Sequence, residues 1–154
     1  MRFTWLVLIA FLVGCSYSVN TRRYENVQSI YVKSVANDTY EYEAGDYLKK
    51  HLTSKIDSMP DILLATKPTT GAADLSVTLL SYERTLHSLD TAGNPKDYVY
   101  SIRVSYVFAS GEVVLDEVES YYYREIVSAT MGNEKDHLMQ RLSENLLRDI
   151  LEGF

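Results

Sequence analysis

The sequence predicts an α+β fold in which two amphipathic helices pack on one face of a mostly antiparallel, four-stranded mixed sheet. Two segments carry apolar residues at helical spacing, and several others alternate apolar and polar residues. Turn signals rich in Gly, Pro, Asn and Asp separate the alternating segments. The 154 residues, 46% of them hydrophobic and 23% charged, suit one domain with a real core, which we place at residues 27–154.

The first expected strand covers residues 27–35, where Ile30 and Val32 alternate with polar neighbours. A helix is expected over 41–59, because apolar residues recur there every four positions: Ala44, Leu48, Leu52 and Ile56. Pro60 ends this helix, and Gly45 makes its first turn uncertain. A second helix is expected to begin after Asn133 and to run nearly to Phe154.

Between the helices, residues 62–65 are expected to form a short edge strand, followed by three long strands over 74–86, 98–108 and 113–123. The apolar parity of the first long strand changes at Leu79 and Leu80, which either a bulge or a change of burial would explain. The segments 90–97 and 110–112 are expected to be turns. Three long strands joined by such turns predict a meander.

The N-terminus resembles a bacterial lipoprotein signal peptide. Arg2 precedes an apolar run that ends at Val13 and is shorter than the roughly 20 residues a membrane-spanning helix needs. Leu12-Val13-Gly14-Cys15 resembles a lipobox, in which a small residue fits the peptidase pocket and the cysteine thiol takes a diacylglycerol. We therefore expect residues 1–14 to be cleaved, Cys15 to carry diacylglycerol and N-acyl chains, and residues 15–26 to form a lipidated tether. Ser16, where an aspartate would favour inner-membrane retention, favours the outer membrane, periplasmic side.

Composition and motifs give little support for an enzyme. A net charge of -6 and a pI near 5.0 leave no basic field for nucleic acid. One cysteine and three scattered histidines suggest no metal centre, and no catalytic motif is found. Asp136 with His137, or Asp116 with Glu117 and Glu119, could act as acid–base or cation sites; solvated surface charge is the simpler interpretation of both. We predict no catalytic residues, no metal and no cofactor beyond the lipid on Cys15.

The candidate interface is a group of tyrosines. Tyr121, Tyr122 and Tyr123 are consecutive, so on a strand they must point to both faces of the sheet. Helices cover only one face, which leaves at least one of them, with Tyr82 on the alternate face of its own strand, for solvent or a partner. Tyrosine suits protein interfaces because its ring buries area while its hydroxyl stays hydrogen-bonded. Ordinary strand propensity is the alternative.

With these elements in order, the chain resembles the LptE family of lipopolysaccharide-assembly lipoproteins. The resemblance is carried by the lipobox, by the segment Ser29-Ile30-Tyr31-Val32-Lys33-Ser34-Val35-Ala36-Asn37-Asp38-Thr39, by Ala73-Asp74-Leu75, by residues 97–104 and by Val114-Leu115-Asp116-Glu117. It implies an outer-membrane lipoprotein that plugs the LptD β-barrel, helps that barrel assemble and takes part in lipopolysaccharide delivery.

The resemblance implies a partner barrel and a steric mechanism. It transfers no lipopolysaccharide contact to this chain, because the turn at 88–94 has no Lys or Arg and the segment before the last helix offers only Arg124 and Lys135. A periplasm-facing outer-membrane lipoprotein that binds and regulates a peptidoglycan synthase is the alternative function.

Overall fold

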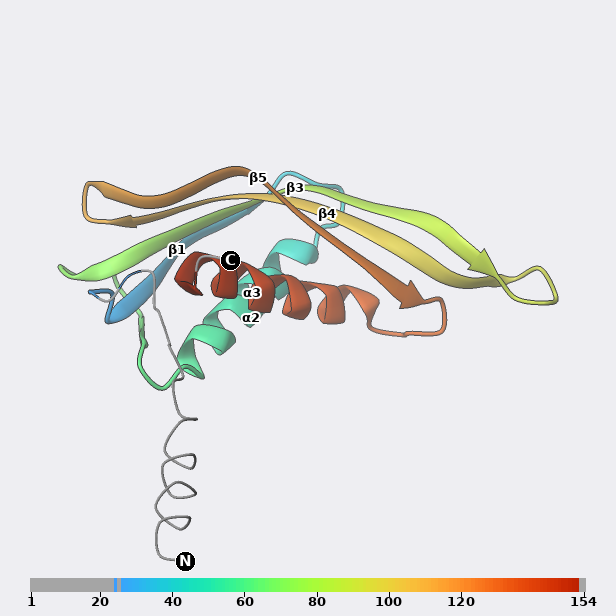
Figure 1. Cartoon of the computed structure of the whole chain (residues 1–154), viewed down its shortest axis with the longest axis horizontal. Coiled ribbons are helices and arrows are strands. Elements are labelled where there is room, and N and C mark those ends of the chain that lie inside the picture. Colours follow the sequence, from blue (N-terminus) through green and yellow to red (C-terminus); the bar gives the residue numbers. More distant parts are fainter. Residues whose placement is uncertain (1–23, 25, 153–154) are drawn as a thin grey trace, which may run out of the picture.

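The structure is a computed structural model that describes residue 24 and residues 26–152. Two helices lie on one side of a twisted sheet, and the sheet extends beyond them at both ends (Figure 1). Its elements in chain order are β1 (Ser29–Asn37), α2 (Ala44–Asp57), β2 (Leu63–Ala65), β3 (Ala72–Leu89), β4 (Pro95–Ser110), β5 (Val113–Ser128) and α3 (Glu134–Glu152). The predicted α+β class is confirmed.

The sheet has five strands in the order β2-β1-β3-β4-β5, where four were expected. The short β2, which was itself expected as an edge strand over 62–65, brings the number to five and pairs in parallel with β1 at the sheet edge. β1 also pairs in parallel with β3, whereas β3, β4 and β5 form the expected antiparallel meander. The sheet is therefore mixed, as predicted, with its parallel pairs at the β1 side.

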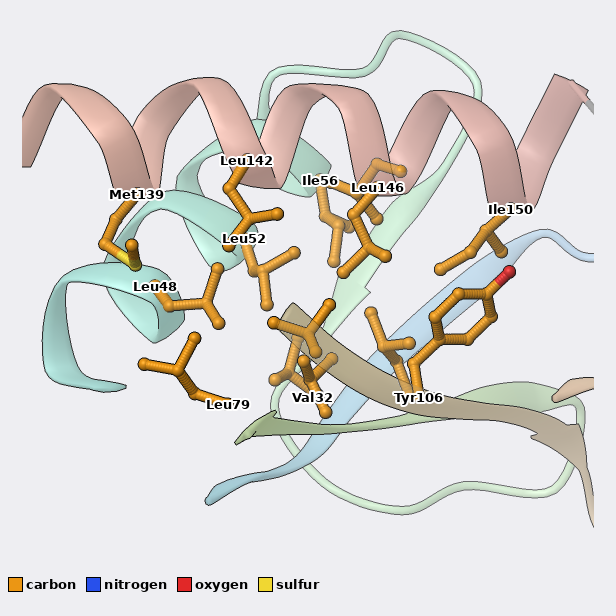
Figure 2. Packing of buried hydrophobic residues seen from close by; sticks show 14 of the residues in the cluster. Val32, Leu48, Leu52, Ile56, Leu79, Tyr106, Met139, Leu142, Leu146 and Ile150 are labelled. Carbon is orange, nitrogen blue, oxygen red and sulfur yellow. The ribbon is translucent and has the colours of Figure 1, made fainter. Parts of the chain in front are cut away.

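The core lies between the helices and one face of the sheet. The stripe of α2 predicted from the sequence is fully buried, and its members are Ala44, Leu48, Leu52 and Ile56. α3 contributes the equally buried Leu138, Met139, Leu142, Leu146, Leu147 and Ile150. Figure 2 shows side chains of both helices meeting Val32, Leu79 and Tyr106 of the sheet. Burial of these apolar side chains is the main stabilising contribution to the fold.

The junction of β1 and α2 explains Gly45. Asn37 accepts hydrogen bonds from the backbone N–H (3.1 Å) and hydroxyl (2.8 Å) of Thr39, and its Nδ2 donates to the Glu41 carbonyl at 2.8 Å. A Cβ on Gly45 would lie 3.0 Å from the Asn37 Cβ. A glycine at this helix position therefore lets α2 approach the end of β1 closely.

The three long strands run further than predicted. Of the two explanations for the parity change, the bulge is the one observed, since the pairing of β3 with β4 shifts between Leu79 and Ser81. β1 pairs with β3 only as far as Leu79, so the distal part of the sheet consists of β3, β4 and β5 alone. Among the described residues, no helix has the length and apolar character needed to cross a membrane.

Candidate interaction surface

The sheet has one face covered by α2 and α3 and one free face. Residues that pair directly across strands share a face. This assigns the free face to a mixed set: the polar Ser76, Thr78, Ser81, Glu83, Thr85, Ser101, Arg103, Ser105, Glu117, Tyr122 and Arg124, and the apolar Val99, Val107 and Ile126. The covered face holds the buried residues Leu75, Val77, Leu79, Ile102, Val104, Tyr106 and Phe108. Only the free face is open to a partner across its whole area.

Tyr122 lies on the free face, opposite Arg103 of β4, and 73% of its surface is exposed. Its hydroxyl is hydrogen-bonded by the side chains of Ser120 and Arg103, which holds the pKa of Tyr122 below its usual value. The ring is therefore presented with a fixed polar end while most of its apolar area remains in water. This combination is typical of an aromatic interface residue.

Tyr82, Tyr121 and Tyr123 lie on the covered face, packed partly buried against the core. The expectation that Tyr82 occupies the alternate face is wrong. The bulge at Leu79–Ser81 changes the parity of the core-facing residues from odd to even numbers, so Tyr82 lies on the covered face and pairs across from the buried Ile102. The sequence showed the phase change without separating a bulge from a change of burial, and only a bulge determines the face of the following residues, here as far as the next register shift at Leu86–Ser88.

These three tyrosines serve the internal packing of the chain. Burial raises the pKa of Tyr121 to about 12, with a hydrogen bond to Asp149 of α3 as the second cause. Burial likewise raises the pKa of Tyr82 and of Tyr123, and Tyr123 donates a hydrogen bond to Glu125. The Tyr82 ring meets the Tyr100 ring edge-on at 5.7 Å. Of the four candidate residues, the geometry leaves Tyr122 on the open surface.

A hollow of about 350 Å³ opens where the covered face emerges from beneath the starts of both helices. It is lined by Glu41, Tyr82, Arg84, Tyr100, Glu134 and Lys135. Lys135 is already paired with Glu41 at 2.9 Å and Glu43 at 3.6 Å, and Arg84 lies 4.6 Å from the Tyr98 ring centre. Two cations and two carboxylates cancel here, so the hollow offers no net charge to an anionic ligand.

The other candidate groups are tied into the fold. Asp136 accepts hydrogen bonds from Lys50 at 3.2 Å and contacts His51 Nε2 at 2.9 Å, which links α3 to α2. His137 contacts Glu125 of β5 at 2.9 Å and so does not face Asp136. Asp116 accepts from the Tyr106 hydroxyl at 3.0 Å on the covered face, whereas Glu117 pairs across from Val107 on the free face.

The acids of β5 therefore do not converge on one point. Within the described residues no group of three or more His, Cys, Asp and Glu side chains could hold a metal ion. Gly14 and Cys15, the predicted cleavage and acylation site, lie outside the described residues. Arg103 is the contact that sequence reasoning did not include, although its place on the polar parity of β4 was visible and could have paired it with Tyr122.

Comparison with known proteins identifies the family to which this fold belongs. A sheet of one parallel and one antiparallel half, covered on one side by two helices, defines a class of small α+β proteins. The model of the LptE family, lipopolysaccharide-assembly, matches residues 27–152, which is most of the chain. The protein belongs to the LptE family, a family of non-enzymatic, membrane-associated lipoproteins of lipopolysaccharide assembly. No curated relative matches the sequence.

Solved structures share the fold at low sequence identity. A PelC dodecamer from Paraburkholderia phytofirmans matches with a TM-score of 0.51 and 17% identity, covering 82% of this chain and 90% of that one. A Xanthomonas campestris protein of the DUF330 family matches with a TM-score of 0.52 and 9% identity, covering 83% and 85%. At these identities the similarity concerns the fold alone.

Proposed function

We propose that this chain is an outer-membrane lipoprotein that occupies the lumen of an LptD-type β-barrel, helps that barrel assemble and so supports lipopolysaccharide delivery to the cell surface. The observation that carries the proposal is the match of the LptE family over residues 27–152. Cleavage before Cys15 and acylation of its thiol and amine hold the chain on the periplasmic side of the membrane.

The free face supports this proposal chemically. The interior of a large outer-membrane barrel is polar, and the free face carries hydroxyl groups of serines and threonines around Tyr122 and Arg103, beside the apolar Val99, Val107 and Ile126. Hydroxyl side chains can donate or accept hydrogen bonds by rotation. Such a face can satisfy the polar groups of a lumen wall, and Tyr122 supplies an aromatic contact within it.

The proposed mechanism is steric and requires no bond-making by the protein. A role as a plug agrees better with the charges than a role as a carrier of anionic lipid. The net charge is -6, and the cations of the hollow at Lys135 and Arg84 are matched by carboxylates. An anionic glycolipid would have to displace the Lys135–Glu41 ion pair to gain one charge contact.

Crosslinking from the free face tests the plug. A photo-crosslinking residue at position 122 should capture a large outer-membrane barrel, whereas the same residue at Lys49, exposed on α2, should capture it weakly or not at all. Depletion of the protein should lower barrel levels and surface lipopolysaccharide. Capture from Lys49 alone, or unchanged barrel levels after depletion, would contradict the proposal; capture of a peptidoglycan synthase would favour the alternative function.

Acylation is tested separately. Metabolic labelling with palmitate should mark the chain and should disappear in the Cys15→Ala variant, because Cys15 is the only cysteine. Label that survives this substitution, or a chain recovered with residues 1–14 attached and no acyl mass, would remove the lipoprotein part of the proposal.

A further inference from the structure

The β4–β5 turn presents two apolar side chains that the fold leaves in water. Val113 is 63% exposed and Val114 is 53% exposed. Between Val107 and Leu115 the only charged residue is Glu112. At the same end of the sheet, Ser29 of β1 pairs with Leu63 of β2, the strand at the opposite edge. Leu63 is 73% exposed.

The two valines point to opposite faces of the sheet. Val113 pairs with Ser110, and Val114 pairs with Ala109, the next residue of β4 and therefore of the other parity. One flat protein surface docked on either face of the sheet could bury only one of them. A medium that surrounds the turn from both sides would bury both, and the interfacial region of a lipid bilayer is such a medium.

The chain leaves the fold at this same end. The Tyr24 hydroxyl donates to the Leu115 carbonyl at 2.9 Å, and the Tyr24 ring packs 5.6 Å from the Phe108 ring. Tyr24 is therefore fixed next to the exposed valines. Eight residues lie between Cys15 and Tyr24, so the two are at most about 30 Å apart when the chain is fully extended.

That reach is short compared with the sheet. β4 alone has 16 residues and is about 50 Å long. Its far end, near the 90–94 turn, is therefore further from Tyr24 than the tether can reach.

We propose that the β4–β5 turn is the membrane-contacting end of the protein, with Val113 and Val114 inserted into the interface of a zwitterionic bilayer. This inference rests on the proposed acylation of Cys15, and it requires the β4–β5 turn to lie outside the barrel lumen that the proposed function assigns to the rest of the chain.

Glu112 indicates the kind of lipid surface. Its carboxylate lies at the tip of the turn and has to remain among the headgroups when the valines enter. No basic residue between Val107 and Leu115 compensates for it, so phosphatidylethanolamine is a better surface than an anionic lipid.

Depth-dependent fluorescence tests the contact. Because Cys15 is the only cysteine and is acylated in the proposed mature protein, an introduced cysteine would be the single free thiol. We would label the lipidated full-length Val114→Cys and Ala92→Cys variants with a polarity-sensitive fluorophore in phosphatidylethanolamine vesicles that contain brominated lipids. The probe at position 114 should shift to shorter wavelength and be quenched, and the probe in the distal turn at position 92 should show neither effect.

A second variant checks that the valines are the cause. Adding Val113→Ser to Val114→Cys should reduce the quenching without changing the melting temperature, since Val113 is mostly exposed in the fold. Vesicle flotation separates the two ways of failing. If the protein does not float, the proposed acylation of Cys15 is wrong. If it floats but the probes at positions 114 and 92 are both unquenched, only the inference about the turn is overturned.

Discussion

Gly45 is a residue at which helix propensity and tertiary packing oppose each other. In α2 an alanine would be favoured over glycine by about 1 kcal/mol. The Asn37 Cβ, however, would lie only 3.0 Å from the new methyl group. Asn37 cannot move away easily, because its side chain holds Thr39 and Glu41 in place through three hydrogen bonds.

We therefore expect Gly45→Ala to lower the free energy of unfolding by about 1 kcal/mol, since overpacking costs more than the propensity gains. Gly132→Ala is the matched control: its Cβ would meet nothing within 4 Å, and the change should be close to neutral. Urea unfolding monitored by circular dichroism measures both. A stabilised Gly45→Ala variant would show that β1 yields to the methyl group.

Tyr121 and Tyr122 are neighbours in sequence with different environments. Tyr121 packs against the core and is linked to Asp149, whereas Tyr122 is mostly exposed on the free face. Tyr121→Ala should lower the free energy of unfolding by about 3 kcal/mol, because it removes a partly buried ring. Tyr122→Ala should change it by less than about 0.5 kcal/mol and reduce capture of the partner. Equal destabilisation by both substitutions in thermal unfolding would contradict this assignment.

At the scale of elements, the start of α3 is connected to α2 by side-chain contacts above the apolar core. Asp136 contacts His51 and Lys50, while Lys135 reaches Glu41 and Glu43 ahead of α2. The contact with His51 and then that with Lys50 lower the pKa of Asp136 from its ordinary value of 3.8. A carboxyl group whose pKa is lower in the folded state than in the unfolded state stabilises the fold while it is ionised.

This linkage predicts a pH dependence with a definite sign. The contribution of Asp136 should be fully present above its unfolded pKa near 3.8 and should be lost as the pH falls through its lower folded-state pKa. Asp136→Asn should therefore be less stable than the natural chain at pH 6, and the difference should shrink toward pH 3. Asp57→Asn, which changes an exposed carboxylate of α2, controls for general charge effects. If urea unfolding gave the same stability difference between Asp136→Asn and the natural chain at pH 6 and at pH 3, the linkage would be excluded.

The elements themselves were largely predictable from local patterns. The four-residue spacing of Leu48, Leu52 and Ile56 predicted α2 and the face it buries, because helical geometry is set within a few residues. The number of strands in the sheet was harder to predict than the strands themselves: the edge strand at 62–65 was expected, but β2 has only three residues and its place in the sheet depends on pairing with β1. The face of Tyr82 was also out of reach, because it depends on how β4 takes up the bulge after Leu79.

At the scale of the whole molecule, the sheet is longer than the layer of helices that covers it. The part near β1 is packed on both α2 and α3, and its β3 residues Leu75, Val77 and Leu79 are buried. The distal part extends beyond the helices (Figure 1), and residues 83–87 of β3 are exposed. The sequence predicted the turn at 90–94 but not this overhang, since it depends on where α3 lies relative to the strands.

This overhang predicts a gradient of stability along the same strands. Backbone amides open locally where few apolar contacts hold them, so residues 83–89 should exchange hydrogen faster than residues 75–79, although both belong to β3. Hydrogen–deuterium exchange followed by mass spectrometry measures the two segments in one experiment. Both segments pair with β4, but only residues 75–79 also pair with β1, so the comparison reports the loss of β1 and of the helices together. Equal protection in the free protein would mean that the distal sheet is held by contacts other than those with α2, α3 and β1, and the stability of the sheet would then not follow the layer of helices.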